Sequence, residues 1–184
     1  MSIATVLFNR MSASASADDR DSVIHAVSHG LRTSGVATIF CAVALIVLAG
    51  PVAILFSGGD RVAATIIAKL IVIMALGTPT LTVTFLYGRV LYAREDARTP
   101  FKIQLFSASI MVVMSFSASL LDAQYTVYAL ACIYPTHNIL LTGISHYLVK
   151  RRLGYYGQKR ILSVYARATF AAVFAAGVTA GVLW

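Results

Sequence analysis

The sequence predicts an all-α protein, a polytopic transmembrane helix bundle with about five spanning helices plus a partial N-terminal helix. Of its 184 residues, 59% are hydrophobic and only 12% are charged, whereas soluble domains carry about 25% charged residues. The mean hydropathy is +0.80. Five apolar stretches reach the length of about 20 residues that a helix needs to cross a bilayer. This composition excludes an ordinary soluble enzyme, a disordered tail and a disulfide scaffold.

The first 33 residues contain no complete span. Residues 1–16 hold a short apolar run and then small polar residues, so we expect a helix end followed by a loop. The run lacks the basic start of a signal peptide, and we expect it to be the cytoplasmic end of a helix whose earlier part is absent. Residues 17–33 predict a helix in the membrane interface, with Val23 and Val27 on its apolar face. A solvated linker helix is the alternative.

The spans that follow contain very few charged residues. Backbone polar groups in lipid must pair within the protein, so long apolar stretches form helices. Strands of a closed barrel would be about 10 residues long and strictly alternating, which these stretches are not. The predicted spans cover residues 34–57, 62–93, 101–121, 125–149 and 161–184.

Basic residues are distributed unequally among the segments between spans. Residues 1–33, 89–102 and 150–160 together contain twelve Lys and Arg, whereas the two remaining connections contain only Arg61. Loops rich in Lys and Arg stay in the cytoplasm. We therefore expect a multi-pass protein with a cytoplasmic N-terminus. The short outer connections predict helical hairpins of the first and second spans and of the third and fourth.

The most specific local pattern lies where the second span ends. Arg89, Tyr92 and Asp96 recur at helical spacing and share one face. Thr99 suits an N-cap, and Pro100 suits the first position of the third span. One interpretation is a tightly capped turn that holds two spans in register. The other is a conformational latch at the cytoplasmic gate of a transporter.

Polar groups inside the spans are candidates for a cavity wall, because such groups are unfavourable in lipid. Interhelical hydrogen bonding is the alternative, and a lysine near a helix end can also extend its amine to the interface. Prolines within three spans predict kinks, which are typical of transporters and also of ordinary helix packing. The candidate cavity residues are Lys69, Thr78, Thr80, His137 and Asn138.

No pattern of catalytic or cofactor-binding residues is visible. The Gly58-Gly-Asp60 segment lacks the Lys-Ser/Thr sequel of a phosphate-binding loop. No histidine pair has zinc-ligand spacing with an acidic residue nearby. We therefore predict neither an enzyme nor a metal or cofactor. The basic residues are split among membrane-flanking loops, so we expect no nucleic-acid partner.

The segment Leu91–Pro100 resembles the F-Y-A-x-x-D-x-x-T-P signature of the MurJ/MviN family of murein lipid II flippases. Tyr92, Ala93, Asp96, Thr99 and Pro100 fit this signature, and Leu91 stands where Phe is usual. Residues 4–12 resemble another family motif, A-T-x-x-x-P-x-L-S, with Asn9 in place of Pro. The similarity covers nearly the whole chain in the correct order.

This resemblance implies a bacterial plasma-membrane protein of the multidrug/oligosaccharidyl-lipid/polysaccharide exporter type. Fourteen helices would form two lobes around a central cavity and two further helices. The chain would be a fragment from the second lobe, and its partners would be a lipid-linked murein precursor, membrane lipids and the missing N-terminal lobe. The lobes would open the cavity alternately to each side of the membrane.

Two other functions remain open from the residues. One is an exporter of another polysaccharide-linked lipid, which shares the cavity but not the signature. The other is a non-transporting truncated remnant or helix-packing scaffold.

Overall fold

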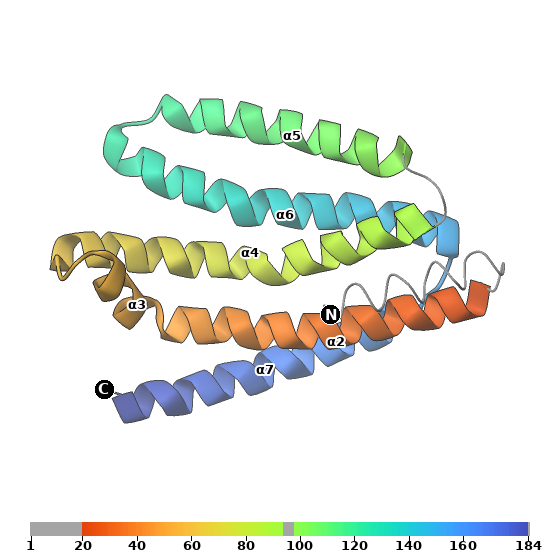
Figure 1. The fold of residues 1–184 in the computed structure, drawn as a ribbon, viewed down its shortest axis with the longest axis horizontal. Helices are drawn as coiled ribbons and strands as arrows, with labels where there is room; N and C mark the ends of the chain where they lie inside the picture. Colours follow the sequence, from red (N-terminus) through yellow and green to blue (C-terminus); the bar gives the residue numbers. More distant parts are fainter. Residues whose placement is uncertain (1–19, 94–97, 184) are drawn as a thin grey trace.

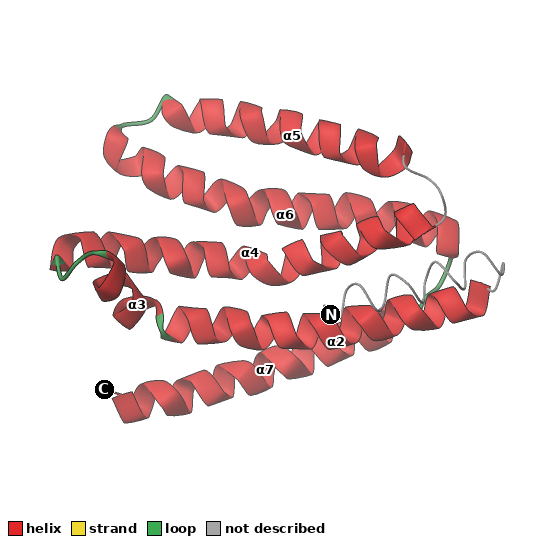
Figure 2. Ribbon diagram, viewed as in Figure 1, coloured by secondary structure: helices red, strands yellow, loops and turns green. Residues whose placement is uncertain are grey.

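The protein is all-helical over the part of the chain that the structure describes. The structure is a computed structural model that describes residues 20–93 and 98–183. These residues form six helices and no strand (Figure 2). Five helices are long and apolar enough to cross a membrane, which confirms the predicted fold class. The helices are α2 (Arg20–Val47), α3 (Ala49–Phe56), α4 (Arg61–Ala93), α5 (Arg98–Ser119), α6 (Ala123–Leu153) and α7 (Gln158–Leu183).

The five long helices lie side by side in the order α5, α6, α4, α2, α7 (Figure 1). The chain forms one hairpin from α2 and α4, with the short α3 packed on α4, and a second hairpin from α5 and α6. α4 and α6 join the two hairpins at the centre of the row. The last helix, α7, returns to pack on the first described one, α2.

The N-terminal part differs from the predicted division into an interfacial helix, residues 17–33, and a span, residues 34–57. Helix α2 continues without interruption through this boundary to Val47. The break lies at Leu48 because Pro51 has no N–H to bond the Val47 carbonyl, four residues earlier. The predicted apolar face is buried, but against protein: Val23, Val27 and Leu31 belong to the core. Residues 1–19 lie outside the described part of the chain.

The largest core cluster lies at the end of the bundle that contains the α6–α7 loop. It joins side chains from four helices to Tyr156 of that loop, which is only 1% exposed. Elsewhere the bundle exposes large apolar side chains, among them Phe116, Phe170 and Leu55. Lipid is a suitable surrounding for such a surface, whereas monomeric soluble proteins rarely expose large apolar patches.

Helices α4 and α6 approach each other closely near the proline that each contains. A Cβ added to Gly77 of α4 would lie 2.9 Å from the Cα atom of Pro135 in α6. Further along the same two helices, the Thr142 hydroxyl donates to the Thr80 carbonyl at 2.9 Å and lies 2.7 Å from the Thr84 hydroxyl. The small residue permits the close approach, and the threonines bridge the two helices with hydrogen bonds.

Candidate functional site

A cavity of about 570 Å³ lies between α4, α5 and α6 and contains several of the predicted site residues. We call it the α4–α5–α6 cavity. It is bounded by residues 81–92 of α4, 100–104 of α5 and 137–145 of α6. The volume is within the range of about 300–1,000 Å³ that is usual for small-molecule sites. Its lining includes Arg89, Tyr92, Pro100, His137 and Asn138.

The α6 wall of this cavity is polar. Asn138 is 3% exposed, and its Nδ2 atom donates to the Tyr134 carbonyl at 3.0 Å. His137 Nε2 is hydrogen-bonded to the hydroxyl of Ser107 in α5, which is also buried. These contacts satisfy buried polar atoms within the bundle. The predicted alternative of interhelical hydrogen bonding therefore holds for His137. His137 and Asn138 also line the cavity.

The α4 wall carries the positive charge of the cavity. The guanidinium carbon of Arg89 lies 4.8 Å from the centre of the Phe85 ring, a cation–π contact within one helix. Tyr92, one turn along, is 51% exposed. Both residues line the same cavity, so the shared face predicted from their spacing exists in the structure. Asp96, the third member of that face, lies outside the described residues.

Thr99 and Pro100 occupy the first turn of α5, which begins at Arg98. The predicted start, with Thr99 as N-cap and Pro100 as the first helical residue, is therefore two residues late, and Pro100 is the third residue of the helix. A proline is tolerated there because the first N–H groups of a helix have no partner within it. The Thr99 hydroxyl accepts a hydrogen bond from Nη2 of Arg152 in α6 at 2.9 Å. Ala93 is the last residue of α4.

The remaining predicted residues lie outside this cavity. Lys69 is exposed on α4. Thr78 is half-buried, and its carbonyl accepts a hydrogen bond from the Thr82 hydroxyl at 3.3 Å. Thr80 lines a second cavity and bonds α6 through its carbonyl. The structure thus brings five of the predicted residues together and separates these three from them.

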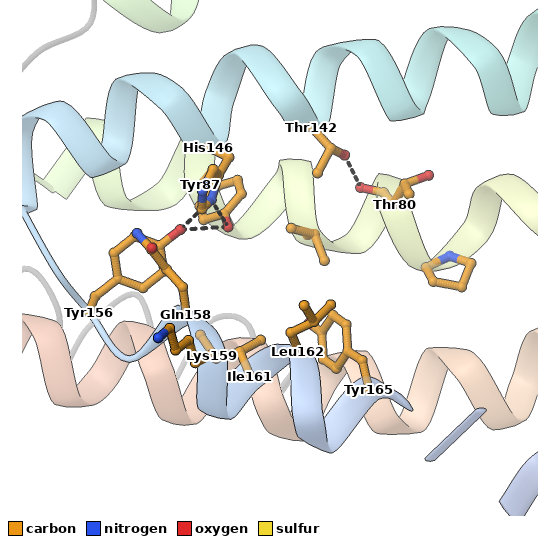
Figure 3. Close-up of a pocket in the computed structure, with 12 residues that line it drawn as sticks. Thr80, Tyr87, Thr142, His146, Tyr156, Gln158, Lys159, Ile161, Leu162 and Tyr165 are labelled. Atoms are coloured by element: carbon orange, nitrogen blue, oxygen red, sulfur yellow. Dashed lines mark hydrogen bonds between the residues drawn. The ribbon is translucent and has the colours of Figure 1, made fainter. Parts of the chain in front are cut away.

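The second cavity, of about 470 Å³, lies between α4, α6 and α7, and we call it the α4–α6–α7 cavity (Figure 3). At one end, Tyr87, His146 and Tyr156 form a triangle. The Tyr156 hydroxyl lies 2.6 Å from His146 Nδ1 and 2.8 Å from the Tyr87 hydroxyl, and the Tyr87 hydroxyl lies 3.0 Å from Nδ1. The triangle fastens the α6–α7 loop to α4. Burial raises the pKa of Tyr156, so this phenol stays protonated and can donate.

The sequence contained no local signal for this triangle. Tyr87 is separated from His146 by 59 residues and from Tyr156 by 69. One of two histidines in an apolar stretch and two tyrosines among nine carry no spacing that predicts a contact. Within residues 20–93 and 98–183, no three His, Cys, Asp or Glu side chains lie together as metal ligands.

Comparison with known protein families gives a match over nearly the whole chain. The family model described as "Lipid II flippase MurJ" matches residues 1–183 of the chain. The chain belongs to this family. MurJ proteins are transporters, and the match indicates a multi-pass membrane protein whose family acts on lipid II. A search of individually curated proteins found no match. Of the MurJ signature that the sequence resembles, Leu91 and Tyr92 at the end of α4 and Pro100 at the start of α5 line the α4–α5–α6 cavity.

Proposed function

We propose that this chain forms the second-lobe part of a MurJ flippase, which moves a lipid-linked murein precursor across the plasma membrane by alternating access. The observation that carries the proposal is the family match over residues 1–183. A first lobe would complete the central cavity. The polar headgroup would cross inside this cavity while its polyprenyl tail remains in lipid.

In this proposal the segment from Arg89 to Pro100 forms part of the cytoplasmic closure. The hydrogen bond from Arg152 to Thr99 supports it, because it ties the start of α5 to the last turn of α6. Arg89 and Tyr92 of the same segment line the adjacent cavity. A contact between two helix ends at the mouth of a cavity can open and close without disturbing the helices themselves. Hydrogen bonds that involve a charged group are worth about 1.5–3 kcal/mol, and less where exposed.

The transport assay uses a bacterium depleted of its own flippase. The chain is co-expressed with the first-lobe segment of a MurJ protein, and arrival of the lipid-linked precursor at the outer leaflet is measured. We expect Arg152→Gln to lower this arrival several-fold, whereas Arg151→Gln, the adjacent change of equal charge, leaves it near the wild-type value. Membrane insertion of both variants is measured by carbonate extraction.

The same assay separates the proposal from its alternatives. A helix-packing scaffold or remnant would leave no precursor at the outer leaflet although the protein is inserted. An exporter of another polysaccharide-linked lipid would restore export of that lipid but not growth of the depleted strain. Equal effects of the Arg152 and Arg151 substitutions would remove the role of the α5–α6 contact while leaving transport itself intact.

We also propose that the connections rich in basic residues face the cytoplasm. Three arginine and lysine side chains end α6, and Lys159 and Arg160 begin α7. After replacement of Cys41 and Cys132 by alanine, a membrane-impermeant maleimide should label Arg61→Cys in intact cells. It should label Tyr155→Cys only after the cells are opened. The reverse pattern would overturn the orientation.

A further inference from the structure

The α4–α6–α7 cavity combines an apolar wall with a polar end, and the transport proposal assigns it no role. Its walls are mainly apolar, with Val83 from α4 and Ile161 and Leu162 from α7. Polar groups gather at the end near the α6–α7 loop (Figure 3). From Gln158 to Tyr165 the α7 wall rises by seven residues, or roughly 10 Å at about 1.5 Å per residue. The cavity therefore extends from the end of the bundle toward its middle.

Hydrogen-bond donors and positive charge are concentrated at the polar end. The Nε2 atom of Gln158 is buried and makes no hydrogen bond of full geometry among the described residues, although the Gln158 side chain lies beside the Tyr156 hydroxyl. A buried donor without an acceptor is unfavourable, so an acceptor supplied by a ligand would satisfy it. Lys159 lines the same cavity with an exposed side chain. None of the lining residues is acidic. This end therefore suits an anion with several acceptor oxygens.

The tyrosine–histidine triangle does not compete for that anion. Its three polar atoms already bond one another at 2.6–3.0 Å. Tyr156 of the triangle is buried, whereas Lys159 and Leu162 of the same lining are exposed. An anion would therefore meet the Gln158 amide and the Lys159 amine first, and an apolar chain attached to it would follow Leu162 and Val83.

We propose that the α4–α6–α7 cavity binds an anionic glycerophospholipid of the membrane. The phosphate diester accepts hydrogen bonds from Gln158 and pairs with Lys159, and one acyl chain lies along the apolar wall. Basic pockets between transmembrane helices at the headgroup level bind acidic lipids by this combination of charge and shape. The nearby Lys150, Arg151 and Arg160 add to the positive potential at this end. This binding is independent of transport, since it needs no first lobe.

The test is direct lipid binding to the purified full chain. The chain is reconstituted in nanodiscs that contain phosphatidylglycerol and phosphatidylcholine with the same acyl chains in equal amounts. Lipid retained by each chain is then counted by native mass spectrometry. We expect one phosphatidylglycerol per chain in preference to phosphatidylcholine. We expect Lys159→Gln to weaken this preference about fivefold, the factor that corresponds to about 1 kcal/mol per basic residue near the surface.

Two further variants distinguish the site from general charge. Arg167→Gln removes the same charge from the exposed face of α7, outside the lining of the cavity, and should change retention less than twofold. Leu162→Trp replaces an exposed lining residue with a bulkier one and should reduce retention of phosphatidylglycerol although no charge is changed. Circular dichroism checks that each variant keeps its helical content.

Several results would overturn the proposal. Equal retention of the two lipids, or equal losses from the Lys159 and Arg167 substitutions, would show that no specific site exists. Full displacement of phosphatidylglycerol by inorganic phosphate would indicate a free-anion site. Displacement one for one by a lipid-linked murein precursor would assign the cavity to the transported substrate. A failed transport assay with intact lipid selectivity would instead count against the proposed function alone.

Discussion

The contact between α4 and α6 predicts opposite effects for the same substitution at two glycines. Gly77→Ala places a Cβ 2.9 Å from the Cα atom of Pro135 and 3.0 Å from the Tyr134 ring. The proline backbone cannot rotate away, so the two helices must separate. Gly143→Ala, on α6, places its Cβ where no atom lies within 4 Å. Both substitutions add the same methyl group to a long helix.

Two energies decide the outcome. Replacing glycine by alanine inside a helix stabilises it by about 0.5–1 kcal/mol. Inserting a methyl group into a closely packed contact costs about 1–3 kcal/mol. Gly77→Ala should therefore destabilise the protein by about 1 kcal/mol, whereas Gly143→Ala should stabilise it by up to about 1 kcal/mol. The threonine bridges between the helices would lengthen in the first variant only.

Unfolding of the purified chain by sodium dodecyl sulfate in mixed micelles, followed by circular dichroism, measures both changes. The midpoint should fall for the Gly77 variant and stay equal or rise for the Gly143 variant. If both variants moved the midpoint in the same direction by the same amount, the close approach of α4 and α6 would not exist in solution.

Three further predictions concern single contacts. Tyr165→Phe removes the hydroxyl that donates to the Leu31 carbonyl at 2.6 Å, and should lower the unfolding free energy by about 1 kcal/mol in the same titration. Asp60→Ala removes an acceptor for two N–H groups at the start of α4, at 2.8 and 3.3 Å, and should cost about 1 kcal/mol, while Asp60→Asn keeps most of it. Because burial raises the pKa of Tyr156, its contribution is complete below about pH 10 and is lost as the pH rises through the folded-state pKa. The stability difference between wild type and Tyr156→Phe should therefore shrink in alkaline solution, and a difference that is constant with pH would contradict the burial argument.

The spans were predictable because a bilayer imposes a length and a composition on any helix that crosses it. The hairpins followed from the short outer connections. Which faces meet was not predictable, since helices surrounded by lipid are apolar on most sides and have no marked periodicity. The contact of Arg152 with Thr99 joins residues 53 positions apart, and nothing at either position indicates the other.

The predicted boundary between residues 33 and 34 illustrates the same limit at short range. The structure has a continuous helix there, in which the Thr38 hydroxyl bonds the carbonyls of Ser34 and Gly35 at 2.9 and 3.1 Å. Gly35 has a packing role instead, because the ring of Tyr165 from α7 lies directly against it. The residues around Gly35 do not indicate whether this glycine ends a helix or contacts a ring from another helix.

The return of α7 to α2 has a consequence for biogenesis. Tyr165 and Leu31 are 134 residues apart, and Ile39 packs with Ala168 and Ala172 across the same interface. During synthesis, α2 enters the membrane long before α7 leaves the ribosome. The face of α2 that packs on α7 must then contact lipid or a chaperone until α7 arrives. Nascent chains arrested before residue 158 should accordingly crosslink through this face of α2 to neighbouring membrane components, and the crosslinks should disappear once α7 has been inserted.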